Sequence, residues 1–170
     1  MLNLARRLIN AIYKRVAPEA YARSIGVTMG SNCRLINVDF STEPYLITLG
    51  DHVSATATRF ETHDGGVWVF RDEFPNIDVV RSIRVGNNVF IGYGTIILPG
   101  VTIGDNVVIG AGSVVAKSIP SNTVAAGIPA SVIKSIDDYR AKSLKSALQT
   151  KGMTPTQKRT FLLNELRLGR

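Results

Sequence analysis

A six-residue pattern repeats through the second half of the chain and restricts the folds available to it. The segment 85–120 reads VGNNVF IGYGTI ILPGVT IGDNVV IGAGSV VAKSIP, and an aliphatic residue opens each hexad. A helix face needs apolar residues about 3.6 apart and a half-buried strand needs alternation, so this period indicates a higher-order repeat. Gly, Asn and Asp recur at one phase, where they permit tight corners between short β-branched strands. The pattern predicts an all-β solenoid whose stacked coils bury columns of Val and Ile.

These hexads resemble the repeat of the hexapeptide-repeat acyltransferases, in which an aliphatic residue and a glycine precede two variable residues and a small one. The string THDGGVWVFR at 62–71 is similar to the bacterial polysaccharide and sugar O-acetyltransferases of that family. The resemblance implies a left-handed parallel β-helix with three hexads in each coil. Handedness depends on the resemblance alone, because the general rule for parallel crossovers favours the right-handed form.

The whole chain divides into three predicted parts. Residues 1–20 carry apolar side chains at helical spacing, interrupted by basic residues, and are predicted to form an N-terminal amphipathic helix. Residues 21–133 form the β-helix domain, with an extruded loop near 62–82 of the kind that is usually functional. Residues 134–170 are predicted as a C-terminal helical extension, with one helix near 137–148 and a second that begins at Thr154-Pro155.

Charge and cysteine content narrow the expected partners. The net charge of +7 comes from the two flanks, but no aromatic interleaving or nucleic-acid module accompanies it, so we expect no nucleic-acid partner. The basic N-terminal helix could lie on an anionic membrane surface or pack against a neighbouring chain. A single cysteine, Cys33, excludes an intrachain disulfide and agrees with a reducing compartment. We expect a cytoplasmic protein that could also associate with a membrane.

Only two histidines are available as a general base. His52 holds the corner position that Asn occupies in other hexads, which predicts a solvent-facing turn residue. His63 lies where the coil gives way to the loop, and the glycines that follow allow close backbone approach. A neutral imidazole can take a proton from a hydroxyl as that oxygen attacks a thioester carbonyl. We predict that His63 is the catalytic base, with packing inside the loop as the alternative reading.

The resemblance supports this assignment, because the catalytic histidine of the family lies on this loop some twenty residues before a phrase that matches Gly86 to Gly92 here. It also implies acetyl-CoA as co-substrate without a metal, and a homotrimer with sites between adjacent chains. The family lays the pantetheine arm along small residues, with lysines near the phosphates. The implied cofactor contacts are Tyr93, Ala111, Ala116, Lys117, Ser131 and Lys134.

Acceptor binding is predicted from three side chains near the loop or the upstream coil. Trp68 offers an apolar face on which a sugar ring could stack, or it could serve core packing or a contact between chains. Asp39 and Asp64 could bind sugar hydroxyls. Asp64 could instead orient His63, as the third member of a catalytic triad orients its base.

We therefore expect an acetyl-CoA-dependent O-acetyltransferase that acts on a sugar or a surface-polysaccharide precursor. Direct transfer in a ternary complex is expected, since no Ser or Cys stands in a recognisable nucleophile motif. The alternatives are N-acetylation of an amino-sugar nucleotide, a serine O-acetyltransferase, and a γ-class carbonic anhydrase, which needs three histidines on zinc. From a different class, the chain could be a non-catalytic trimeric β-solenoid scaffold. The loop with His63 and the small residues at 110–117 favour an enzyme.

Overall fold

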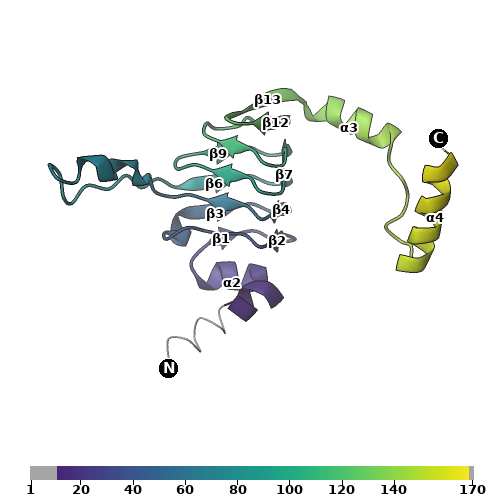
Figure 1. The fold of residues 1–170 in the computed structure, drawn as a ribbon, viewed down its shortest axis with the longest axis horizontal. Coiled ribbons are helices and arrows are strands. Elements are labelled where there is room, and N and C mark those ends of the chain that lie inside the picture. Colours follow the sequence, from purple (N-terminus) through teal and green to yellow (C-terminus); the bar gives the residue numbers. More distant parts are fainter. Residues whose placement is uncertain (1–10, 169–170) are drawn as a thin grey trace. The chain divides into compact units, whose positions relative to one another are not determined.

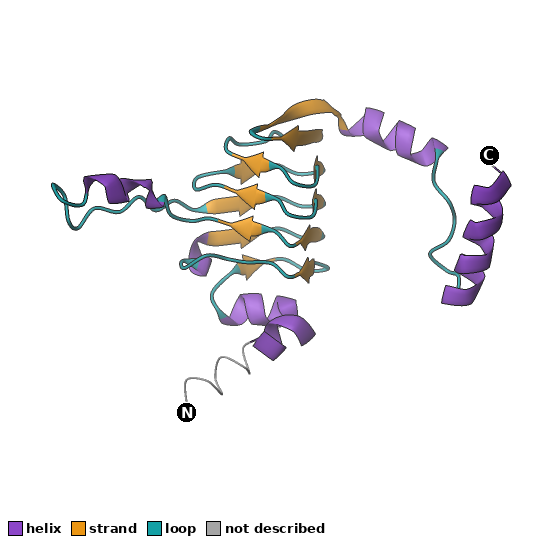
Figure 2. Cartoon of the chain, viewed as in Figure 1, coloured by secondary structure: helices purple, strands orange, loops and turns teal. Residues whose placement is uncertain are grey.

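The computed structural model describes residues 11–168 of the chain (Figures 1 and 2). The chain separates into two units, residues 1–139 and 140–170, and each is described by itself. The predicted N-terminal helix lies in part outside the described residues. Within them, residues 11–16 are helical and α2 follows at Pro18–Ser24.

Three sheets of short strands make up most of the first unit, and their stacking is parallel apart from one terminal strand. The first sheet contains β1 (Thr28–Met29), β3 (Ile47–Leu49), β6 (Ile83–Val85) and β9 (Thr102–Ile103). The second contains β2 (Arg34–Ile36), β4 (Val53–Thr56), β7 (Val89–Ile91), β10 (Val107–Ile109), β12 (Thr123–Gly127) and β13 (Ala130–Ser135). The third contains β5 (Arg59–Phe60), β8 (Ile96–Ile97) and β11 (Val114–Val115). From β6 to β11 the chain visits the three sheets in turn.

The strand register gives the length of one coil. Val89 pairs with Val107, and Asn87 lies 18 residues before its hydrogen-bond partner Asp105, which equals three hexads. One coil earlier the separation is 36 residues, as between His52 and Asn88, because the extruded loop is inserted there. The predicted hexad repeat and parallel stacking are thus confirmed.

The residues that open the hexads form the core, as predicted. Ile91, Ile97, Ile103 and Ile109 are fully buried in columns between successive coils. Burying each such side chain contributes about 1.5–3 kcal/mol. Small polar residues share this interior without an unsatisfied group, since the hydroxyl of buried Ser113 donates to the carbonyl of Gly110 at 2.7 Å.

The corners between the first and second sheets are closed by residues in the left-handed backbone region. His52, Asn88, Asn106 and Asn122 all have φ between 55° and 62°. Asn adopts this region more readily than most residues, so the recurrent Asn follows from the corner geometry. The position predicted for His52, an exposed turn residue, is the one observed.

The two ends of the stack differ. At the N-terminal end α2 covers the coils, with Ala22 buried in the core and the Glu19 carboxylate accepting a hydrogen bond from the backbone N–H of Leu35 (Figure 1). At the other end β12 and β13 form an antiparallel pair around Ile128-Pro129, a strand pair that the hexad pattern did not predict. α3 then begins at Ile136.

The two predicted C-terminal helices are present as α3 (Ile136–Lys145) and α4 (Pro155–Leu168). The side chain of Thr154 accepts a hydrogen bond from the backbone N–H of Gln157 at 3.3 Å, which is the expected N-terminal cap. Among residues 11–168, no helix combines the length and apolar character that crossing a bilayer would require.

Candidate active site

The extruded loop projects away from the stacked sheets (Figure 1). Its base holds His63. His63 forms an antiparallel bridge with Val80. On either side of it, the N–H of Asp64 donates to the carbonyl of Val79 and the N–H of Arg81 donates to the carbonyl of Thr62, both at 2.8 Å. These bonds close the neck of the loop, so His63 is placed by paired backbone rather than by a free loop.

A carboxylate from an upstream segment faces the imidazole. Glu43 precedes the short 3-10 helix η1 (Pro44–Leu46), in the segment that leaves the regular coil before β3. Its Oε2 lies 3.3 Å from His63 Nδ1 and accepts a 2.6 Å hydrogen bond from the hydroxyl of Thr62. Its Oε1 accepts a 2.6 Å hydrogen bond from the hydroxyl of Thr42. The exposed fractions of the two side chains, 34% for His63 and 20% for Glu43, leave the pair reachable from solvent.

These contacts favour the ionised form of Glu43 and one tautomer of His63. The hydrogen bonds from Thr42 and then Thr62, with a further contribution from His63, hold the pKa of Glu43 below its ordinary value. An ionised carboxylate only accepts hydrogen bonds, so Nδ1 of a neutral His63 carries the proton and Nε2 keeps its lone pair. The geometry therefore presents Nε2 as the basic atom.

Two pockets meet at this histidine. One, of about 380 Å³, is lined by Glu61, His63, Arg81, Leu98, Pro99 and Ala116 among others. The second, of about 550 Å³, is lined by Thr42, Glu43, His63, Trp68, Arg71 and Asp78 among others. Because His63 lines both, a base at this position can act on a molecule in one pocket that reacts with a molecule in the other.

Three of the residues predicted to contact the cofactor lie at the ends of strands in the third sheet, some before a strand begins and one after a strand ends. Ala116 follows β11 and lines the smaller pocket together with His63 of the same chain. Tyr93 and Ala111 lie in the turns that lead from the second sheet into the third, before β8 and β11 begin. Tyr93 is 68% exposed. Neither of these two residues lines a pocket that contains His63.

The remaining predicted cofactor contacts are Lys117 and two residues of β13. Lys117 is exposed next to Ala116. Ser131 and Lys134 belong to β13, where they pair with Ala126 and Val124 of β12. Neither residue of β13 lines a pocket that contains His63.

The predicted acceptor residues have different surroundings. Trp68 lies on the 3-10 helix η2 (Gly65–Phe70), is 73% exposed and lines the larger pocket. Asp39 lies 3.8 Å from Arg59 in an ion pair and accepts a hydrogen bond from the N–H of Ser41. Asp64 accepts a 2.9 Å hydrogen bond from the N–H of Gly66 as the cap of η2, so Glu43 rather than Asp64 faces the imidazole.

Sequence reasoning missed Glu43, since nothing in the hexad spacing singles out a carboxylate twenty residues before the histidine. In the part of the chain that the structure describes, no group of three or more His, Cys, Asp or Glu side chains is arranged to hold a metal ion.

Replacing Glu43 by glutamine is expected to flatten the pH dependence of stability. The folded pKa of Glu43 is lowered, so the unfolded chain takes up the proton first as the pH falls. The stabilisation is complete above the ordinary value of 4.5 and disappears as the pH falls through the lower folded pKa. Chemical denaturation at a series of pH values measures this slope. Glu73→Gln, on the exposed loop, is the control, and an unchanged slope in Glu43→Gln would contradict the carboxylate contacts described here.

The chain is similar to known bacterial transferases in sequence and in structure. The family profile described as bacterial transferase hexapeptide (six repeats) matches residues 82–117. Protein CapG of Staphylococcus aureus is 50% identical over 169 residues, which covers 97% of this chain and 98% of CapG. The likeness to CapG therefore includes the loop, the segment that carries Glu43 and most of the C-terminal helices.

Two further likenesses are to galactoside acetyltransferases. The galactoside O-acetyltransferase of Escherichia coli is 44% identical over 115 residues, covering 67% of this chain and 54% of that enzyme. A solved structure of galactoside acetyltransferase in complex with coenzyme A is 27% identical and superposes with a TM-score of 0.59, covering 89% of this chain and 86% of that one.

Proposed function

We propose, from the premise that this chain belongs to the hexapeptide-repeat acetyltransferases, that it moves an acetyl group from acetyl-CoA to a hydroxyl of a sugar or surface-polysaccharide precursor. The sugar class is supported by the likeness to galactoside O-acetyltransferase. The observation that carries the proposal is the position of His63, which is backed by the Glu43 carboxylate and lines two pockets at once.

The mechanism follows from the basic Nε2 of His63. Acetyl-CoA supplies the acetyl group as a thioester. Nε2 takes the proton of the acceptor hydroxyl as its oxygen bonds to the acetyl carbon, the carbon–sulfur bond breaks, and the proton passes to the leaving sulfur. Glu43 holds the imidazole in the required tautomer and stabilises its positive charge while the proton resides there. The chain then needs no covalent acyl-enzyme.

The smaller pocket suits the thioester arm of the donor. Leu98, Pro99 and Ala116 provide apolar walls, and the single methyl of Ala116 leaves room for a chain to approach. Arg81 supplies a positive group in the same pocket, and Lys117 lies beside it for a phosphate. These residues favour Ala116 and Lys117 as donor contacts.

The larger pocket suits the acceptor. Trp68 presents an exposed aromatic face, on which the apolar face of a sugar ring can stack. Asp78 and Arg71 line the same pocket and can accept from and donate to hydroxyl groups. An acceptor held here would reach His63 from a different pocket than the donor.

We also infer that three chains assemble with the third sheet toward the common axis, and that the coils wind left-handed as in the solved relatives. Ile96 and Val114 on the outer side of that sheet are apolar and only half-buried. In a threefold assembly each chain contacts its neighbour through two different surfaces, so the start of the third-sheet strands in one chain can face the end of those strands in the next. Tyr93 and Ala111 of one chain would then approach His63 and Ala116 of the next, which supports a homotrimer with sites between chains.

Enlarging Ala116 tests the donor pocket. Acetyl-CoA at about 100 times its dissociation constant should stabilise the wild-type protein by about 2.7 kcal/mol, and Ala116→Leu should lose most of this gain because its side chain occupies the pocket. Thermal unfolding with and without millimolar acetyl-CoA measures the effect. Thr102→Leu, on the exposed face of the first sheet, is the matched control. An equal gain in Ala116→Leu would place the donor elsewhere.

A further inference from the structure

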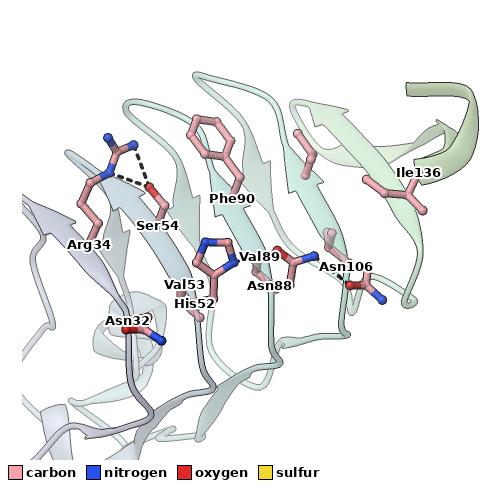
Figure 3. Close-up of a pocket in the computed structure, with 12 residues that line it drawn as sticks. Asn32, Arg34, His52, Val53, Ser54, Asn88, Val89, Phe90, Asn106 and Ile136 are labelled. Carbon is pink, nitrogen blue, oxygen red and sulfur yellow. Dashed lines mark hydrogen bonds between the residues drawn. The ribbon is translucent and has the colours of Figure 1, made fainter. Parts of the chain in front are cut away.

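A groove lies on the outer face of the second sheet, separate from both pockets at His63 (Figure 3). The strand register places Arg34 beside Ser54, Ser54 beside Phe90 and Phe90 beside Val108. Neighbouring strands are about 4.8 Å apart, so this outward row runs for roughly 14 Å along the stack. The groove has a volume of about 350 Å³.

One end of the groove carries a cation without an acidic partner. Arg34 donates from Nε and Nη2 to the hydroxyl of Ser54, at 3.1 and 2.9 Å, and its other N–H groups stay available. No carboxylate lines the groove, and among residues 11–168 no Asp or Glu lies within ion-pair distance of Arg34. The guanidinium is therefore placed to receive an anionic group from a ligand.

The side wall is a ladder of amides with unused hydrogen-bonding capacity. His52 Nδ1 lies 2.9 Å from Asn88 Oδ1, Asn88 Nδ2 donates to Asn106 Oδ1, and Asn106 Nδ2 donates to Asn122 Oδ1. In these contacts Asn88 and Asn106 each use one N–H and one oxygen lone pair. Each side chain therefore keeps one N–H donor and one lone pair for a ligand. Because Asn88 Oδ1 accepts, His52 donates from Nδ1, and a neutral His52 keeps an acceptor at Nε2. The wall thus offers donors and acceptors in alternation.

An aromatic face completes the groove. Phe90 is 45% exposed and lies in the outward row between Ser54 and Val108, beside the amide ladder in Figure 3. Aromatic rings bind the apolar faces of flat ligands while polar neighbours bind their edges. A groove with one cation, one aromatic ring and paired donors and acceptors matches a hydroxyl-rich ring that also carries an acid.

We propose that this groove binds a segment of an acidic oligosaccharide, with a carboxylate on Arg34, a sugar ring on Phe90 and hydroxyls on Asn88 and Asn106. A hydroxyl both donates and accepts, as the ladder requires. A nucleic-acid strand is disfavoured, because one cation neutralises only one phosphate in the length of the groove. Its residues are absent from the His63 pockets, so binding here is independent of acetyl transfer.

The test measures binding by calorimetry on the full chain without acetyl-CoA, using tetragalacturonate, neutral maltotetraose and a thymidine tetranucleotide as probes. Tetragalacturonate is expected to bind best, and Arg34→Gln is expected to weaken it roughly tenfold, as loss of a charge-assisted hydrogen bond does. Phe90→Ala should also weaken it. Arg84→Gln, an exposed arginine on the outer face of the first sheet, should bind like wild type.

Several outcomes would overturn the proposal. Equal binding of maltotetraose would remove the acidic class, and tighter binding of the tetranucleotide would indicate a nucleic-acid ligand. Binding of tetragalacturonate that survives both Arg34→Gln and Phe90→Ala would place it outside the groove, and absence of binding would remove the site. Folding of each variant is verified by circular dichroism. Acetyl transfer to a galactoside, measured in parallel, reports on the His63 site and separates failure of this proposal from failure of the proposed function.

Discussion

Replacing His63 by alanine is expected to lower kcat for acetyl transfer by about 10²–10⁴-fold, the usual contribution of a positioned general base. His63 is the residue shared by the two pockets, and its Nε2 is free because Glu43 faces Nδ1. The affinity for acetyl-CoA should change much less, because the imidazole acts on the acceptor proton rather than holding the donor. Release of coenzyme A, followed with a thiol reagent at saturating acetyl-CoA, measures the loss.

The control for this variant is Arg84→Ala, which removes an exposed side chain from the first sheet, and it should keep wild-type kcat. Thermal unfolding verifies that both variants fold. If His63→Ala retains kcat within about a factor of ten, the base assignment is wrong, since the remaining effect would be that of a lost contact. A large rise in KM for acetyl-CoA with unchanged kcat would instead make His63 a binding residue.

Replacing Phe60 by alanine is expected to lower the free energy of unfolding by about 3–5 kcal/mol, as for other fully buried phenylalanines. Phe60 is completely buried in β5, and its ring stacks on that of Phe40 with centroids 5.6 Å apart. The loss combines transfer of the ring into water with the cavity left between coils. Because Phe60 lies only three residues before His63 in the chain, transfer activity should fall as well.

Phe90→Ala provides the matched control for stability, since the same side chain is removed from an exposed outward position in β7. Its effect should stay within about 1 kcal/mol. Urea denaturation, compared at equal protein concentration, measures both variants. A similar small loss for both phenylalanines would mean that the third sheet is not packed as described.

The regular part of the fold could be predicted because its information is local and repeated. Each hexad from Val85 onward carries an inward aliphatic residue and a corner, so one coil predicts the next, and the register between Val89 and Val107 follows from counting. The return of β13 against β12 could not be predicted, because the segment 130–135 lacks the hexad pattern and its pairing depends on the end of the stack.

The candidate site was predictable only in part for a related reason. His63 stood out as one of two histidines, beside a loop and a pair of glycines. Glu43 reaches it through a segment that leaves the coil and returns, and that path is set by tertiary packing rather than spacing. Asp64 was the nearer carboxylate along the sequence, but the backbone of η2 engages it first, because an Asp two residues before Gly66 can cap the turn locally.

The most direct test of the proposed transfer uses acetyl-CoA labelled with ¹³C at the carbonyl and, in separate reactions, a galactoside, an acidic oligosaccharide or an amino-sugar nucleotide as acceptor. Carbon NMR distinguishes an ester from an amide at that carbonyl. We expect an ester signal that grows with wild-type enzyme and stays at the uncatalysed level with His63→Ala. An amide signal on an amino-sugar nucleotide, with no ester on any hydroxyl acceptor, would contradict O-acetylation. Equal ester formation by His63→Ala would contradict the mechanism.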